Sequence, residues 1–193
     1  MATSVADKRA AFRRLHEAGC FVLPNPWDVG SAALLQHLGF KALATTSAGM
    51  AWSMGCADGG VGLEQALDHF SQLARATDLP VNADFENAFG DAPNEVAKNV
   101  ALAADTGIAG LSVEDYSGRE IYEFDLGLYQ MPTLSRYAVF SPFSVFRMPR
   151  AIGLSSRSFG EAYSYVSTVR KTGLCAQTSA GSRRNLVTHC VAH

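Results

Sequence analysis

The sequence predicts an α/β fold in which parallel strands alternate with helices. Short apolar runs in the first 126 residues alternate with segments whose apolar residues recur at helical spacing. Each strand and its helix together take about 30 residues, the usual length of a unit that places successive strands parallel in one sheet.

This pattern places four strands and four helices along residues 1–126. Strands are expected at 21–23, 41–45, 81–84 and 108–113, and helices at 28–38, 63–77 and 93–105. An amphipathic helix is also expected within residues 1–19. Asp28 is suited to cap the helix that it begins. Pro93 favours a first helical turn, and Gly107 the carboxyl end of that helix.

The charge distribution separates residues 1–126 from residues 127–193. The first region holds 17 acidic and 8 basic residues, whereas the second holds one acidic residue, Glu161, and 8 basic ones. The second region also contains ten serines, against seven in the longer first region. One evenly patterned fold rarely divides so sharply, so we interpret residues 127–193 as an atypical basic, serine-rich tail. Its basic residues are dispersed, which argues against a nucleic-acid partner.

Neither a membrane segment nor a disulfide framework is expected. No run of about 18 apolar residues occurs. The first 19 residues lack the apolar centre of a secretory signal, which favours a cytoplasmic location. Cys20, Cys56, Cys175 and Cys190 are scattered, a spacing typical neither of a zinc site nor of a disulfide framework. Cys20 is expected to be buried in the first strand.

Acidic residues follow the predicted strands where each strand ends. Asp84 and Glu86 follow the third strand, Glu114 and Asp115 the fourth, and Asp58 lies in a glycine-rich loop after the second. Right-handed crossovers bring such strand ends to one edge, where parallel sheets and barrels carry their chemistry. Any one carboxylate could simply cap the next helix. Five on one edge, with no histidine or cysteine nearby, predict a site for Mg²⁺ or Mn²⁺ rather than zinc.

Small polar and aromatic residues follow the first two strands. The turn after the second strand carries hydroxyl and N–H groups that could hold a carboxylate or a phosphate. Two tryptophans could line the same pocket, although aromatic residues more often belong to the core. The loop that carries Asp58 lacks the spacing of a dinucleotide site, and we interpret it as a mobile segment. The residues concerned are Asn25, Trp27, Thr46, Ser47, Ala48, Gly49 and Trp52.

Two stretches of the sequence resemble the isocitrate lyase / phosphoenolpyruvate mutase superfamily. The stretch that resembles the opening of these enzymes reads LPNPWDVGSAALLQHLGFKALATTSAGMAWSMGCADGG. The stretch that resembles their metal-binding centre reads LPVNADFENAFGDAPNEVAKNVALAADTGIAGLSVEDYSG. The resemblance covers about residues 8–126. It implies a (β/α)8 TIM barrel, with residues 1–126 forming the N-terminal half of about four βα units.

The resemblance also implies a chemistry and a set of site residues. It implies Mg²⁺ (or Mn²⁺) and a lyase or mutase reaction of a small α-keto or hydroxy carboxylic acid through an enolate-like intermediate. Asp84 matches the principal metal-ligand aspartate. Asp58, Glu86 and Glu114 match acidic positions that hold the metal directly or through water, and Asp58 and Glu114 are also expected to act in catalysis. The substrate-binding positions are Asn25, Trp27, Thr46, Ser47, Ala48 and Gly49.

The sequence departs from the superfamily in two places. Lyases that cleave isocitrate or methylisocitrate carry a cysteine in a K-[KR]-C-G-H loop after the fourth strand, where this chain reads EDYSGREIYEFDL. The arginine of an A-R-x-E-like fifth strand is also missing from residues 127–193, and Arg119 is the candidate replacement. Three hypotheses therefore stay open: an active lyase or mutase, a truncated product of a shifted reading frame with a poorly ordered tail, and a metal- and carboxylate-binding remnant. Superfamily members often form dimers or tetramers by exchanging C-terminal helices; because this chain lacks that region, a homo-oligomer is one option and its oligomeric state stays open.

Overall fold

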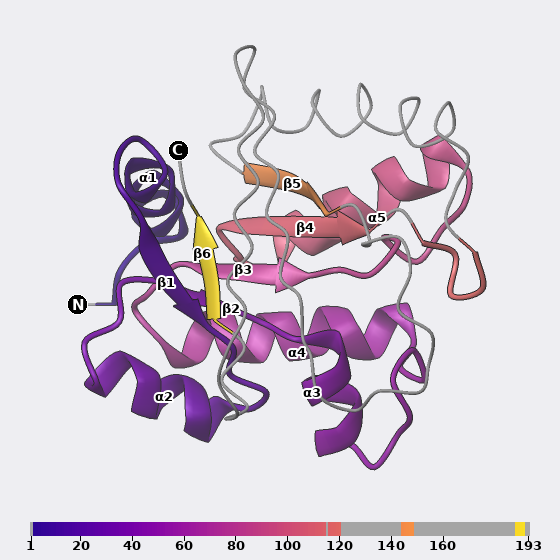
Figure 1. Cartoon of the computed structure of the whole chain (residues 1–193), viewed down its shortest axis with the longest axis horizontal. Coiled ribbons are helices and arrows are strands. Elements are labelled where there is room, and N and C mark those ends of the chain that lie inside the picture. The colour runs from indigo at the N-terminus through magenta and orange to yellow at the C-terminus, as the bar shows by residue number, and fades with distance from the viewer. Residues whose placement is uncertain (1, 115, 121–143, 149–187, 192–193) are drawn as a thin grey trace.

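The protein is described by a computed structural model that alternates strands and helices from its amino terminus (Figure 1). The structure describes residues 2–114 and 116–120 in full, and the backbone of residues 144–148 and 188–191. The helices are α1 (Val5–Leu15), α2 (Val29–His37), α3 (Ser47–Ser53), α4 (Leu63–Ala76) and α5 (Pro93–Asp105). The strands are β1 (Phe21–Pro24), β2 (Leu43–Ala44), β3 (Val81–Asp84), β4 (Gly110–Glu114), β5 (Ser144–Met148) and β6 (Thr188–Val191).

The strands form a parallel sheet of order β2-β3-β4-β5 and a separate antiparallel pair, β1-β6. Ala44 lies opposite Asn82, Asp84 opposite Ser112, and Glu114 opposite Met148. The parallel arrangement confirms the predicted α/β class. The described strands do not close into a barrel, so the complete (β/α)8 barrel stays a prediction.

Most of the predicted elements are confirmed within one or two residues, whereas β2 covers only Leu43–Ala44 of the predicted strand at 41–45. Strand β3 has the predicted bounds, and Asp28 caps α2 by accepting a hydrogen bond from the Ser31 N–H at 2.6 Å. Helix α3 was predicted as a turn, and β4 begins two residues later than expected. Strands β5 and β6 lie in the tail, where the sequence analysis did not extend the alternation of strands and helices. The other tail residues lie outside the described part of the chain.

The expectation for Cys20 was wrong on both counts. Cys20 precedes β1 rather than lying in it, and its side chain is exposed. It is also disulfide-bonded, and its partner is not among the side chains that the structure describes. Cys56 is a free, half-buried thiol. Among the described helices, none combines the length and the apolar character needed to cross a bilayer.

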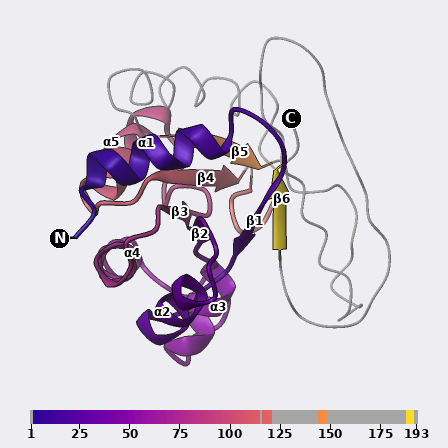
Figure 2. The ribbon, with the colours of Figure 1, turned by 90° about the vertical axis from the view of Figure 1, so that its left-hand side faces the viewer.

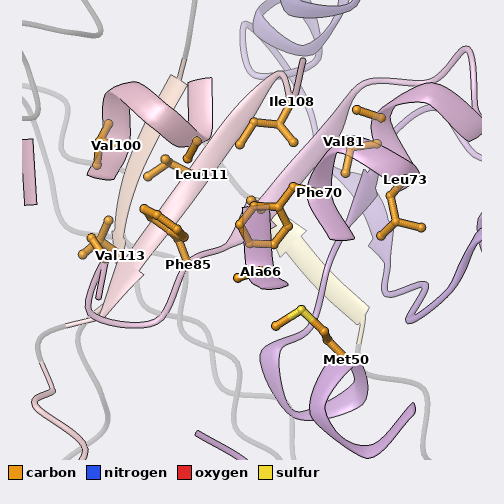
Figure 3. Close-up of a cluster of buried hydrophobic side chains, with 14 of the residues drawn as sticks. Met50, Ala66, Phe70, Leu73, Val81, Phe85, Val100, Ile108, Leu111 and Val113 are labelled. Atoms are coloured by element: carbon orange, nitrogen blue, oxygen red, sulfur yellow. The ribbon is translucent and has the colours of Figure 1, made fainter. Parts of the chain in front are cut away.

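The main core fills the space between the sheet and helices α4 and α5 (Figure 3). Alternate strand residues such as Val81, Leu111 and Val113 point to this side. Phe70 of α4 meets Phe85, which follows β3, with ring centroids 5.8 Å apart and an edge-on geometry. Because side chains alternate along a strand, Asn82, Asp84, Ser112 and Glu114 lie on the opposite face of the sheet.

Helix α1 lies beyond the amino-terminal ends of β3 and β4 (Figures 1 and 2). Its buried Lys8 donates to the carbonyls of Ala74 and Thr77 at the carboxyl end of α4. The neighbouring Arg9 donates to the Ala104 carbonyl at the carboxyl end of α5 and to the Ile108 carbonyl. Two adjacent cations thus satisfy carbonyls that two helix ends leave free. Helix α1 and these contacts therefore lie on the side of the sheet opposite the carboxyl ends of β3 and β4 (Figure 1).

Candidate metal centre

Three carboxylates lie at or just after the carboxyl ends of β3 and β4, and a fourth, Asp58, lies within electrostatic range of Glu86. Asp84 is the last residue of β3 and Glu114 the last of β4, while Glu86 follows β3 by two residues. The Glu114 N–H donates to the Glu86 carbonyl at 2.6 Å, which joins the two strand ends. Asp58 comes from the loop between α3 and α4 and is exposed.

The other three carboxylates act on the pKa of Glu86. Burial, which is the largest cause, and the negative charges of Asp84, Asp58 and Glu114 together raise the pKa of Glu86 from 4.5 to about 7. These are the four residues that the sequence predicted as metal ligands. Asp115, the fifth acidic residue of the prediction, lies outside the described residues. The convergence of Asp58 with strand ends up to 56 positions away in the sequence supports the inferred topology.

The segment that carries Glu86 has an unusual backbone. Glu86, Ala88 and Phe89 all have positive φ angles, of 47°, 60° and 54°. Non-glycine residues rarely adopt this left-handed conformation, which costs roughly 1–2 kcal/mol per residue. The side-chain amide of buried Asn99, on α5, donates to the carbonyls of Ala88 and Phe89 at 2.9 and 3.1 Å. Asn99 therefore holds the strained segment from the helix side.

Sequence reasoning missed Asn99, although the sequence contains a signal for it. Asn99 shares the buried face of α5 with Val96, Val100 and Ala103. A polar residue at such a position must find hydrogen-bond partners in the core. An amide within an apolar helical stripe thus indicates a buried polar contact, although it does not name the partner.

Asp84 is held by residues at the end of β2. Its Oδ2 accepts two hydrogen bonds from Ser47, one from the backbone N–H and one from the Oγ hydroxyl, both 2.9 Å long. The backbone N–H of Asp84 donates to Thr45 Oγ1 at 2.8 Å. Thr45 was also missed by the sequence analysis. Among these contacts, Oδ1 of Asp84 is the carboxylate oxygen left for a ligand.

The predicted carboxylate-binding turn is the first turn of α3. Thr46 caps the helix, and its Oγ1 accepts from the Gly49 N–H at 3.2 Å. The Ser47 N–H is used by Asp84. The Ala48 N–H has no acceptor among the described residues and is the one backbone donor of this turn left for an anion. Glycine is required at position 49, because a Cβ there would lie 2.6 Å from Thr46 Cγ2 and 3.2 Å from Trp27 Cβ.

The remaining predicted residues lie around this turn. Asn25 donates to the Ala44 and Thr45 carbonyls at 2.9 and 3.2 Å, which links β1 to β2. Its Oδ1 is buried and has no partner among the described residues. Trp27 is 51% exposed and contacts the turn through its Cβ, while Trp52 is 67% exposed, so neither belongs to the core. Arg119 is also exposed.

The donor set suits a hard divalent cation that retains water. Within residues 2–114 and 116–120, no three histidine, cysteine, aspartate or glutamate side chains approach closely enough to cage an ion. Their charges nevertheless act on one another, since electrostatic interactions extend beyond ligand distances. Mg²⁺ favours one or two direct carboxylates with several waters, which fits Asp84 as direct ligand and the other three through water.

Comparisons with known proteins identify the family. Residues 12–138 match the model of the phosphoenolpyruvate phosphomutase family. A solved structure assigned as a lyase/mutase, from Burkholderia cenocepacia J2315, is 44% identical with a TM-score of 0.71 over 75% of this chain and 53% of that one. The chain is also 30% identical to an oxaloacetate decarboxylase of Pseudomonas entomophila, over 56% of this chain and 38% of the relative. It is 30% identical to a 2-methylisocitrate lyase of Halalkalibacterium halodurans, over 54% and 35%.

These relatives are longer than the chain, which spans about half of the solved one and less than two fifths of the curated ones. The family match nevertheless covers more than half of the chain and includes each of the four carboxylates. The protein belongs to the phosphoenolpyruvate phosphomutase family of the isocitrate lyase / phosphoenolpyruvate mutase superfamily.

Proposed function

We propose that the protein binds Mg²⁺ or Mn²⁺ and acts as a lyase or mutase on a small α-keto or hydroxy carboxylic acid, such as oxaloacetate or phosphonopyruvate. The observation that carries the proposal is the cluster of Asp58, Asp84, Glu86 and Glu114, whose mutual repulsion helps to raise the Glu86 pKa to about 7. A divalent cation relieves this repulsion. Such a cluster therefore favours cation binding over a purely structural role.

Each residue has a defined part in this proposal. Asp84 would hold the ion through Oδ1, and Glu86, Asp58 and Glu114 would hold it through water. A bound cation would supply Lewis-acid stabilisation of the negative charge of an enolate-like substrate. The Ala48 N–H orients the substrate carboxylate, and the buried Oδ1 of Asn25 accepts a hydrogen bond from a substrate hydroxyl or an ordered water. A bound cation would favour the ionised form of Glu86, whose pKa is raised by burial and by the neighbouring carboxylates.

A second candidate is a metal- and carboxylate-binding protein without turnover. The charges acting on Glu86 are all negative, and the candidate arginine of the described part, Arg119, is exposed. A dianionic substrate is usually held by a charge-assisted contact with a cation. Binding without such a contact is weaker and less well oriented, which favours this alternative over catalysis.

Thermal unfolding with oxalate, a planar mimic of the enolate, tests binding. The proposal predicts a cooperative transition whose midpoint rises when Mg²⁺ and oxalate are both present, and not with oxalate alone. Asp84→Asn is expected to abolish the shift, while Asp91→Asn, an exposed position outside the cluster, keeps it. Loss of oxaloacetate in the presence of the wild-type chain and Mg²⁺ would then distinguish an enzyme from a binding protein. Absence of any shift in the wild-type chain would contradict both candidates.

A further inference from the structure

The contacts of Ser47 with Asp84 point to a role different from substrate binding. Ser47 is the first residue of α3, so the cap at Thr46 fixes the direction of its backbone N–H. Both its N–H and its Oγ–H donate to the same atom, Asp84 Oδ2, at 2.9 Å. Because both donors of Ser47 are bonded to Asp84, neither is available to a substrate carboxylate.

We propose that Ser47 is a positioning residue for Asp84, which sets the metal affinity of the site by presenting Oδ1 alone to the ion. This inference rests on the proposed function. The two hydrogen bonds fix the rotation of the carboxylate, and the bond from the Asp84 N–H to Thr45 Oγ1 fixes the backbone that carries it. Asp84 is thus held by two residues just beyond β2, Thr45 and Ser47. Partners that orient a metal-binding carboxylate commonly change metal affinity by about 10-fold to 100-fold.

The hydroxyl can be removed without removing the backbone donor. Ser47→Ala keeps the N–H contact to Asp84 Oδ2 and loses only the Oγ–H contact, so we expect Mn²⁺ affinity to fall by about tenfold, at the lower end of that range. Ser47→Thr retains the hydroxyl and is expected to bind within about twofold of wild type. Ser53→Ala is the matched control, because Ser53 lies on the same helix and its Oγ–H donates to the Met50 carbonyl at 2.7 Å.

The experiment measures free Mn²⁺ by electron paramagnetic resonance during titration of each metal-free protein, so that no turnover is required. A tenfold loss in Ser47→Ala, with recovery in Ser47→Thr and no change in Ser53→Ala, supports the positioning role. A purely structural role would lower the melting temperature of Ser47→Ala and leave its Mn²⁺ dissociation constant unchanged, which would overturn the inference alone. A wild-type chain that binds no Mn²⁺ would overturn the proposed function and the inference with it.

Discussion

Replacing Glu86 with glutamine should stabilise the metal-free protein at alkaline pH. In the folded protein Glu86 holds its proton up to a pKa of about 7, against 4.5 without the fold. The folded state therefore binds this proton more tightly than the unfolded state does. Its contribution to stability is fully present below pH 4.5 and is lost as the pH rises towards 7. Above pH 7 the ionised group carries a constant cost, which a neutral glutamine avoids.

The size of this effect follows from the pKa difference. The difference of about 2.5 between 4.5 and 7 corresponds to about 3.4 kcal/mol. Glu86 is only half-buried, so solvent screening reduces the value, and we expect Glu86→Gln to gain about 1–2 kcal/mol at pH 8. The gain should shrink at pH 5, where the wild-type carboxyl is already protonated in the folded state.

Urea unfolding with a chelator present, at pH 5 and pH 8, measures the gain. Glu17→Gln is the control, because Glu17 is an exposed carboxylate outside the cluster and its replacement should change stability little at either pH. In saturating Mg²⁺ the order should reverse at pH 8, since the ion compensates the wild-type charge. A Glu86→Gln protein that is no more stable than wild type at pH 8, or equally stabilised at both values, would refute the electrostatic reasoning.

Two further predictions concern buried contacts away from the carboxylates. Asn99→Leu removes both donors to the strained segment and should lower the free energy of unfolding by about 2 kcal/mol, while exposed Asn94→Leu on the same helix does not. Faster amide exchange in residues 86–89 would accompany the Asn99 change, and unchanged exchange would contradict the assigned contact. Lys8→Met leaves the Ala74 and Thr77 carbonyls without their donor and should cost about 2 kcal/mol in urea unfolding. Exposed Arg13→Met on the same helix is its control, and equal losses in both would argue against the contact.

The confirmed elements are those in which local and tertiary preferences agree. Strand β3 is a short apolar run introduced by Leu79-Pro80 and ended by a carboxylate, and its predicted bounds hold. Helix α5 begins at Pro93 and ends just before Gly107, whose φ of +94° suits the residue after a helix. In both cases the residues that end the element also suit the tertiary structure, so the sequence pattern was sufficient.

The elements that were missed depend on contacts that a sequence pattern does not contain. Helix α3 has seven residues, including Gly49. The sequence predicted a turn there, because so short a segment has little helical preference of its own. It forms where Thr46 caps it and Asp84, 37 residues away from Ser47, accepts from its first N–H. Strand β5 is a five-residue run in a serine-rich tail, between Pro142 and Pro149 in the sequence, and pairing with β4 defines it.

The sequence predicted which residues lie at the site better than it predicted the hydrogen bonds between them. Parallel topology alone placed Asp84, Glu86 and Glu114 at one edge of the sheet, since that inference needs only the positions of strand ends. The hydrogen bonds around them were not predictable, because they depend on side-chain rotamers and on the left-handed backbone at Glu86. The sequence therefore assigned Ser47 to the substrate, whereas the structure places its donors on Asp84.

Backbone strain and carboxylate repulsion both occur at the carboxyl ends of β3 and β4. Their occurrence at one place favours a site that binds a cation over a structural remnant. Three non-glycine residues in left-handed conformations cost roughly 1–2 kcal/mol each, and four carboxylates repel one another at the same place. Neither cost is needed for the core, which lies on the other face of the sheet around Phe70 and Phe85. A chain free of ligand-binding demands would gain stability by losing either feature. A bound divalent ion, as proposed above, would relieve the repulsion at the residue that the left-handed segment carries, Glu86.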